Sequence, residues 1–218
     1  MQANPLFAIA TWIVPLVFAI VLHEIAHGWV AHAFGDPTAK EQGRLTLNPI
    51  RHVDPFGTII LPMVLALAGA PVFGWARPVP VNAARLRNPR IQMMLVALAG
   101  PGMNFLLALV AALALMVAAS ADPSAFLVAN LRNFLVINVF LGVFNLLPIP
   151  PFDGGHVVEG LLPRPLARSY RKLSRFGFPL VLFLLVVLPV LAPQANVVRA
   201  IVVPPFRALM HLFGAIAG

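Results

Sequence analysis

The residues with the clearest chemical potential are His23-Glu24-Ile25-Ala26-His27, an H-E-x-x-H motif. Two histidines four residues apart lie on one face of a helix, so both imidazoles can bind the same metal ion. The glutamate between them can take a proton from a water molecule bound to that ion. The spacing therefore predicts a hydrolytic zinc site, with His23 and His27 as ligands and Glu24 as the catalytic acid and base.

The motif follows an apolar segment, because no side chain from Met1 to Leu22 carries a formal charge. Ionisable groups inside a membrane are costly and are usually kept for a function. The whole chain has the same character: of its 218 residues, 60% are hydrophobic and 10% charged, and the mean hydropathy is +0.91. Soluble domains have about 25% charged residues. We therefore expect an integral membrane protein that forms a single domain over residues 1–218.

The net charge of +8 does not indicate nucleic acid, because the basic residues cluster between apolar runs. Basic residues in that position mark cytosolic loops of membrane proteins, so no nucleic-acid partner is expected. The absence of cysteine excludes disulfides and thiolate zinc sites. The N-terminus has no basic region before its apolar run, which argues against a cleaved signal peptide. A bound metal must use His, Asp or Glu.

A hydrolytic zinc site has three protein ligands and one open position, so the histidines need one further partner. The chain contains seven carboxylates: Glu24, Asp36, Glu41, Asp54, Asp122, Asp153 and Glu159. Asp36, Asp54 and Asp122 each precede a proline, as turn residues do. Asp153 precedes two glycines and follows an apolar stretch, which makes it the best candidate for the third ligand. The alternative is an ordinary Asp-Gly turn after a proline run.

The hydropathy pattern predicts an all-α polytopic membrane protein with about four to five transmembrane helices. We expect these helices at residues 5–34, 91–121, 133–152 and 176–198, with 201–218 as a last short span or an interfacial helix. Residues 5–162 would form the catalytic core and 176–218 the C-terminal helices. Polar and apolar residues alternate in 43–48, and residues 77–82 look extended. Both patterns predict short β-strands near the active site.

Residues 56–76 are uncharged but interrupted by Gly and Pro, so they either span the membrane or enter and return. The re-entrant alternative places nearly all basic clusters on one side, which should be the cytosol. It also brings Asp153 to the same level as the histidines, whereas a spanning segment puts the carboxylate across the membrane. We therefore expect a re-entrant segment, an external N-terminus and an active site toward the cytosolic side.

Three segments together resemble the site-2 protease family of intramembrane zinc metalloproteases: His23–His27, Gly100-Pro-Gly-Met-Asn104 and Asn145-Leu-Leu-Pro-Ile-Pro-Pro-Phe-Asp153-Gly154. Gly35-Asp-Pro-Thr-Ala-Lys and Gly43-Arg-Leu-Thr-Leu-Asn-Pro49 are similar to the compact prokaryotic branch, without PDZ or CBS domains. The resemblance covers roughly residues 19–162.

The resemblance implies that the chain binds one Zn²⁺, with the ligands His23, His27 and Asp153. It makes Glu24 the catalytic acid and base, and it gives Asn104 and Asn145 roles in binding the substrate backbone or stabilising the oxyanion. The family cleaves transmembrane helices of other proteins. The implied partners are therefore a transmembrane protein substrate and the lipid bilayer, and the implied location is the cell (inner) membrane of a prokaryote.

Other functions fit the same residues. The main alternative is a non-enzymatic metal transporter or sensor that uses the His/His/Asp site, which would not require Glu24 as a base. A membrane zinc peptidase acting on a soluble or lipidated tail is another. An inactive scaffold is disfavoured, because every motif residue is present. The sequence does not indicate the substrate or the oligomeric state.

Overall fold

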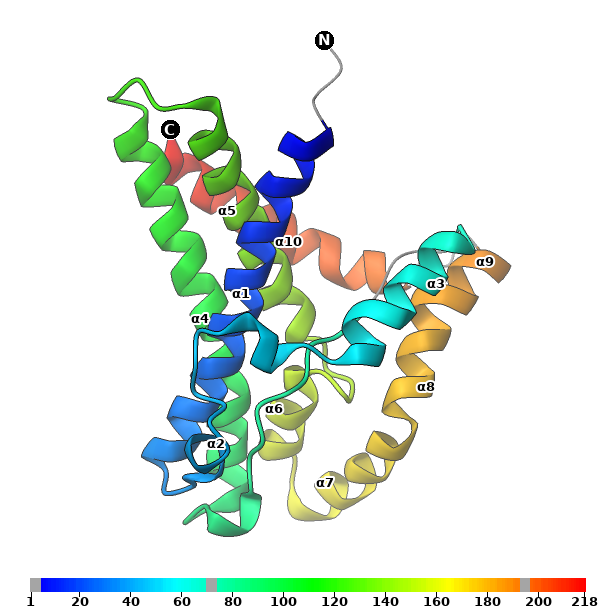
Figure 1. The fold of residues 1–218 in the computed structure, drawn as a ribbon. Coiled ribbons are helices and arrows are strands. Elements are labelled where there is room, and N and C mark those ends of the chain that lie inside the picture. Colours follow the sequence, from blue (N-terminus) through cyan, green and yellow to red (C-terminus); the bar gives the residue numbers. More distant parts are fainter. Residues whose placement is uncertain (1–4, 70–73, 193–196) are drawn as a thin grey trace.

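The structure is a computed structural model that describes residues 5–69, 74–192 and 197–218, and these residues are mostly helical (Figure 1). The long helices are α1 (Pro5–Ala33), α4 (Pro89–Ala118), α5 (Ala125–Asn145) and α10 (Val197–Ala217). The shorter helices are α2 (Thr38–Glu41), α3 (Leu61–Leu67), α6 (Asp153–Leu161), α7 (Arg164–Arg171), α8 (Gly177–Leu182) and α9 (Leu188–Leu191). Single turns and irregular helices occupy Pro49–His52, Pro55–Ile60, Ala83–Arg85, Lys172–Phe176 and Phe183–Val187. The all-α prediction is confirmed.

Among the described residues, five helical stretches are long and apolar enough to cross a membrane: Ile9–Ala33, Pro89–Ala118, Ala125–Asn145, Arg164–Leu191 and Val198–Ala217. The expectation of a multi-pass membrane protein is therefore confirmed, and the C-terminal helix has the length of a span. Helix α5 begins eight residues earlier than expected at 133, because the Ser124 hydroxyl accepts a hydrogen bond from Leu127 N–H and caps the helix.

Helix α4 is the centre of the bundle and packs most extensively against α5 and α1. Its buried face carries Ala108, Ala111 and Ala112, and these small side chains allow the neighbouring helices to approach closely. Leu135 and Val139 of α5 fill the space opposite them. This close packing fixes α5 relative to α4 and thereby the position of everything that follows α5.

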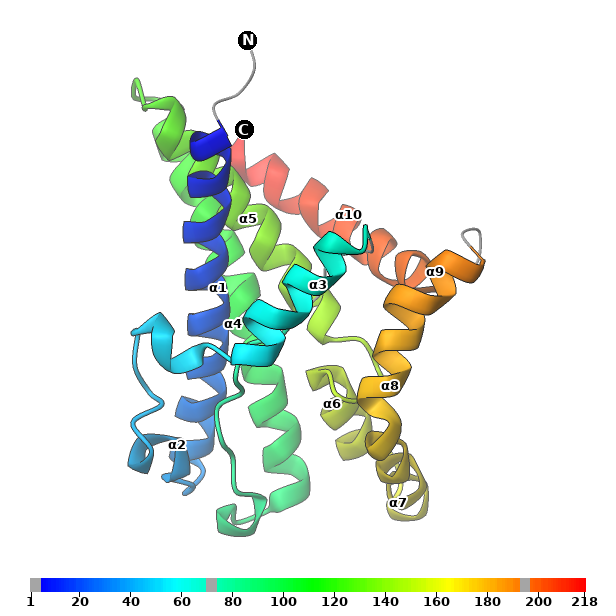
Figure 2. The ribbon, with the colours of Figure 1, turned by 45° about the vertical axis from the view of Figure 1, so that its right-hand side comes forward.

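Helices α1 and α5 run in the same direction, and α4 runs in the opposite direction and packs against both (Figures 1 and 2). The C-terminal end of α5 therefore comes to the level of the second half of α1. Helix α6 starts there and packs against α4. Helix α1 continues past this level and ends just before Gly35, whose φ of 102° stops the helix.

The expected β-strands at 43–48 and 77–82 are wrong, since neither segment forms a strand in the part of the chain that the structure describes. Residues 77–82 are extended, but they do not face a neighbouring strand. Their N–H groups donate hydrogen bonds to separate acceptors. Arg77 N–H donates to His52 O, Val79 N–H to Glu24 Oε2 and Asn82 N–H to Asp36 Oδ2. Irregular loop and helix atoms thus replace the ladder that a strand would need.

The expected re-entrant segment at 56–76 is not supported. The structure shows instead a short apolar helical stretch, Pro55–Leu67, on the outside of the bundle, and residues 70–73 lie outside the described residues. Asp54 caps this stretch by accepting a hydrogen bond from Gly57 N–H at 2.6 Å. Trp75 N–H then donates to Gly57 O at 3.1 Å. The chain therefore returns to the start of the stretch before it continues to α4.

Candidate metal centre

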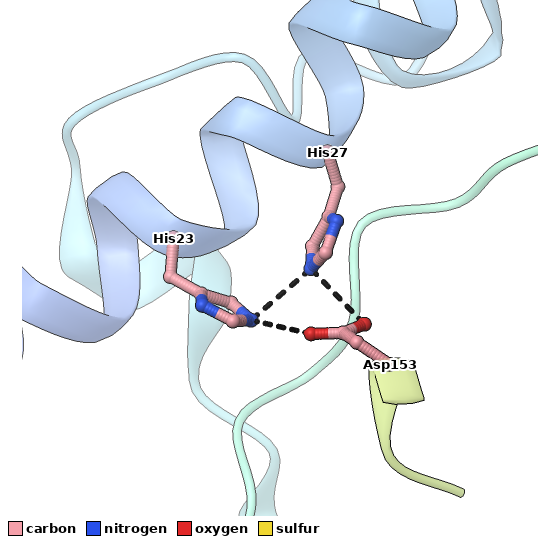
Figure 3. A group of neighbouring side chains, drawn as sticks. All are labelled: His23, His27 and Asp153. Atoms are coloured by element: carbon pink, nitrogen blue, oxygen red, sulfur yellow. Dashed lines mark hydrogen bonds and ion pairs between the residues drawn. The ribbon is translucent and has the colours of Figure 1, made fainter. Parts of the chain in front are cut away.

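His23 and His27 of α1 and Asp153 of α6 form a compact group (Figure 3). The two Nε2 atoms lie 3.1 Å apart. His23 Nε2 lies 3.2 Å from Asp153 Oδ2, and His27 Nε2 lies 3.4 Å from Asp153 Oδ1. The histidines are 7% and 9% exposed. Residues 126 positions apart in the sequence thus meet at one nearly buried point, as the sequence predicts for Asp153.

The donor atoms fit a zinc ion. Zn–N and Zn–O bonds of about 2.0–2.2 Å in a tetrahedron separate the ligand atoms by about 3.3–3.6 Å, close to the three distances given above. The Nδ1 atoms of both histidines face oxygen acceptors, which leaves the Nε2 lone pairs directed at each other. Asp153 Oδ2 is buried without a hydrogen-bond partner. Two imidazole nitrogens and a carboxylate at this spacing are a donor set that could hold a metal ion.

A chain of buried amides holds His23. Its Nδ1 lies 2.6 Å from Asn104 Oδ1, which acts as an acceptor because Asn104 Nδ2 donates to Asn138 Oδ1 at 2.8 Å. Asn138 Nδ2 donates in turn to Phe134 O at 2.8 Å. Both asparagines are fully buried. Such outer contacts fix the tautomer and the ring orientation of a ligating histidine.

Sequence reasoning missed Asn138. The available signal was an amide inside an otherwise apolar stretch of α5, where an unpaired polar group is unfavourable.

His27 is held by the backbone of α4, because its Nδ1–H donates to Val96 O at 2.7 Å. The helix approaches so closely that a Cβ atom on Gly100 would lie 2.4 Å from His27 Nε2 and 2.5 Å from His23 Cε1. No side chain fits there. The site therefore requires a glycine at position 100. The sequence motif contained Gly100, but the sequence alone did not indicate this role.

Asp153 is the first residue of α6, and the end of α5 determines its place. A Cβ atom on Gly154 would lie 2.3 Å from Leu146 O and 2.4 Å from Leu147 O. These are backbone atoms that cannot rotate away. The glycine lets α6 start directly beneath the end of α5, which directs the preceding carboxylate toward α1.

Glu24 lies on α1 between the two histidines and is half-buried. Its Oε2 accepts a hydrogen bond from Val79 N–H at 2.7 Å, so one carboxylate oxygen is held by the backbone of residue 79. Asn145 is the last residue of α5, and its side chain donates to Leu141 O within the same helix. The structure therefore joins Asn104 to the candidate ligands through His23 but records no such contact for Asn145.

A sequence model of peptidase family M50 matches residues 11–130 and 117–188, most of the chain. A Bacillus subtilis (strain 168) protein named "Putative zinc metalloprotease YwhC" is 40% identical over 217 residues, which cover 95% of each chain. Rip2 proteins, with the same zinc metalloprotease description, are 33% identical in Mycolicibacterium smegmatis and 37% identical in Mycobacterium tuberculosis (strain ATCC 35801 / TMC 107 / Erdman). These matches cover 83% and 81% of this chain and 67% and 66% of the relatives.

No solved structure matches the chain significantly. The family match, the relatives, the His/His/Asp group and the long apolar helices point to the same conclusion. The chain belongs to peptidase family M50, the site-2 protease family, and is a multi-pass membrane zinc metallopeptidase.

Proposed function

We propose that the chain cleaves peptide bonds within or near the transmembrane segments of other proteins. In this proposal one Zn²⁺ is held by His23, His27 and Asp153. The observation that carries the proposal is the tetrahedral spacing of these three donors inside a membrane-type helix bundle. Bound zinc polarises a carbonyl oxygen and lowers the pKa of a bound water to about 7.

Glu24 is proposed as the general acid and base. The hydrogen bond from Val79 N–H holds one of its oxygens, and the other oxygen accepts the proton of the attacking water. Glu24 then gives that proton to the leaving amine. Because the carboxylate is fixed before the substrate arrives, little reorganisation is needed during the reaction.

The proposed substrate is a membrane-spanning helix. Its carbonyls are engaged in intrahelical hydrogen bonds, so it must unwind locally, and helix-weakening residues near the cut are expected. An apolar cavity of about 360 Å³ lies beside the end of α5, lined by residues that include Leu147, Pro148 and Val202. It offers a place for apolar substrate side chains. We propose that Asn145, next to this cavity, binds the substrate backbone, and that Asn104 acts through His23.

The proposed location is the cell (inner) membrane of a prokaryote, with the N-terminus outside and the active site toward the cytosol. The parallel course of α1 and α5 (Figure 1) and the grouping of His27 with Asp153 are consistent with ligands that lie toward one side of the membrane. The basic residues between α1 and α4 and those around α7 then fall at the same end of the bundle, in agreement with the positive-inside rule. The proposed domain is the whole chain, residues 1–218.

The test is to incubate the purified protein with a panel of single-span substrates, with and without a zinc chelator, and to map the products by mass spectrometry. We expect cleavage inside the predicted span that stops on chelation. The variant Glu24→Gln should bind zinc as the unmodified protein does and cleave nothing. Metal transport that survives in Glu24→Gln would favour a transporter, and cuts outside the span would favour a peptidase of soluble tails.

A further inference from the structure

The segment between α2 and α3 contains a buried cation that the proposed chemistry does not use. Arg44 is 6% exposed, and among the described residues it has no carboxylate within ion-pair distance. Its Nη2 donates to Arg77 O at 2.7 Å and to Pro78 O at 3.4 Å, while Nε is buried without a partner. Burying a guanidinium with incomplete pairing is costly. Its position therefore needs a reason in the structure that it holds.

Arg44 holds residues 77–82, which we call the strap. The strap is fixed on both sides of Val79. On one side Arg77 O accepts from Arg44, and Arg77 N–H donates to His52 O at 2.8 Å. On the other side Asn82 N–H donates to Asp36 Oδ2 at 2.6 Å. Between these anchors Val79 N–H points at Glu24 Oε2.

Gly28 lets the strap reach α1. It lies one turn after Glu24 and therefore on the same face of the helix. A Cβ atom on Gly28 would lie 3.0 Å from Val79 Cγ1 and 2.4 Å from Leu45 Cδ2. The residue after Arg44 and the residue that bonds Glu24 thus share the space that this glycine leaves. Arg44, Leu45 and the strap form one packed unit against α1.

We propose that Arg44 is a positioning residue for the general base. Its guanidinium holds two consecutive strap carbonyls, which directs the Val79 amide onto one oxygen of Glu24 and leaves the other oxygen free. The catalytic consequence rests on the proposed function of Glu24, whereas the mechanical link between Arg44 and Val79 does not. A lysine ammonium lacks the planar fork and cannot replace this geometry fully.

Hydrogen exchange measured by mass spectrometry tests the link on peptides that contain residues 77–82. Arg44→Gln should accelerate exchange of the Val79 amide at least about tenfold, because a hydrogen bond to a charged group is lost. Arg51→Gln is the matched control, since Arg51 is an exposed cation of the same segment, and it should change nothing. Glu24→Gln should also accelerate exchange, and the double variant should be non-additive, because both changes act on one amide. Unchanged exchange in Arg44→Gln, or additive effects, would overturn the proposal.

The catalytic consequence is measured on a cleavable substrate. Arg44→Gln should lower kcat about 10- to 100-fold, as expected for a displaced catalytic group, with KM changed less than about twofold. Zinc content should stay at the unmodified level, and Arg44→Lys should recover only part of kcat. Faster exchange with an unchanged kcat would refute the positioning role. A wild-type protein that cleaves nothing would refute the proposed function. The exchange experiment would still test whether Arg44 positions the Val79 amide.

A second variant covers the case in which Arg44→Gln does not fold, as judged by thermal unfolding. Gly28→Ala replaces a helical glycine by a better helix former, but its methyl group pushes Val79 and Leu45 away from α1. It should accelerate exchange of the Val79 amide and lower kcat with the zinc content unchanged. Arg44→Lys reads the same link with a smaller change and should accelerate exchange less than a complete loss of the guanidinium would. Exchange of the Val79 amide that stays unchanged in Arg44→Lys and in Gly28→Ala would overturn the proposal.

Discussion

The sharpest consequence of the site geometry concerns one methyl group on α4. In Gly100→Ala the new Cβ atom would lie 2.4 Å from His27 Nε2, whereas ordinary contacts lie at 3.4–4 Å. The imidazole must therefore move by about 1 Å, or the two helices must separate. Distances from a metal to its ligands tolerate only about ±0.2 Å. The substitution should thus remove His27 from effective coordination.

The expected loss can be estimated from the contacts. Changes that only disturb the partners of metal ligands cost about 10- to 100-fold in affinity. A displaced ligand should cost at least the upper value, about 100-fold or 2.7 kcal/mol. Gly102→Ala is the matched control, because a Cβ atom there meets nothing within 4 Å, and it makes the same exchange of residues in the same helix.

The assay is competition for zinc against a chromophoric chelator with the purified variants in detergent. Thermal unfolding with and without zinc supplies a second reading, because a ligand stabilises the folded state in proportion to its affinity. Gly100→Ala should lose zinc affinity and most of the thermal shift, and Gly102→Ala should retain both. Wild-type affinity in Gly100→Ala, or an equal loss in both variants, would refute the assignment of the histidines.

Three further predictions concern the supports of the site. Asn138→Leu should lower zinc affinity about 10- to 100-fold through Asn104 and His23, whereas Asn130→Leu in the same helix should not, as chelator competition will test. Gly154→Ala should reduce zinc content in elemental analysis, because the new methyl group would meet the backbone carbonyls of Leu146 and Leu147. Burial raises the pKa of Asp36, but hydrogen bonds from Thr38 and Asn82 outweigh it and hold the pKa below its ordinary value of 3.8. The stabilisation by ionised Asp36 is fully present well above 3.8 and is lost as the pH falls through the lower pKa of the folded state, so the Tm difference to Asp36→Asn should be constant from about pH 7 to about pH 5 and shrink as the pH falls below 3.8.

The sequence could place the histidines on one helix face, because that relation follows from the local period of a helix. It could also select Asp153, since the chain has few carboxylates and every other aspartate precedes a proline. Long apolar runs predicted the long helices. These features depend on neighbours along the chain or on composition, which a single sequence contains.

The strand predictions were wrong because alternating polar and apolar side chains show only that successive residues have different surroundings. They do not show that a partner strand is present. In 43–48, Arg44 turns to the strap and Leu45 packs at Gly28, and no ladder is needed to explain the pattern. Asn138 and Gly100 could not be assigned, because their roles depend on the rotation of α4 against α1 and α5. That rotation is set by side-chain packing across the bundle.

Two imidazoles and one carboxylate should bind a single zinc ion between α1 and α6. X-ray absorption spectroscopy at the zinc edge, on purified protein of known metal content, measures this coordination. We expect one zinc per chain, about two imidazole nitrogens at about 2.0–2.1 Å and the rest oxygen, with one imidazole lost in His27→Ala. Substoichiometric zinc, or a spectrum unchanged in His27→Ala and Asp153→Ala, would contradict it.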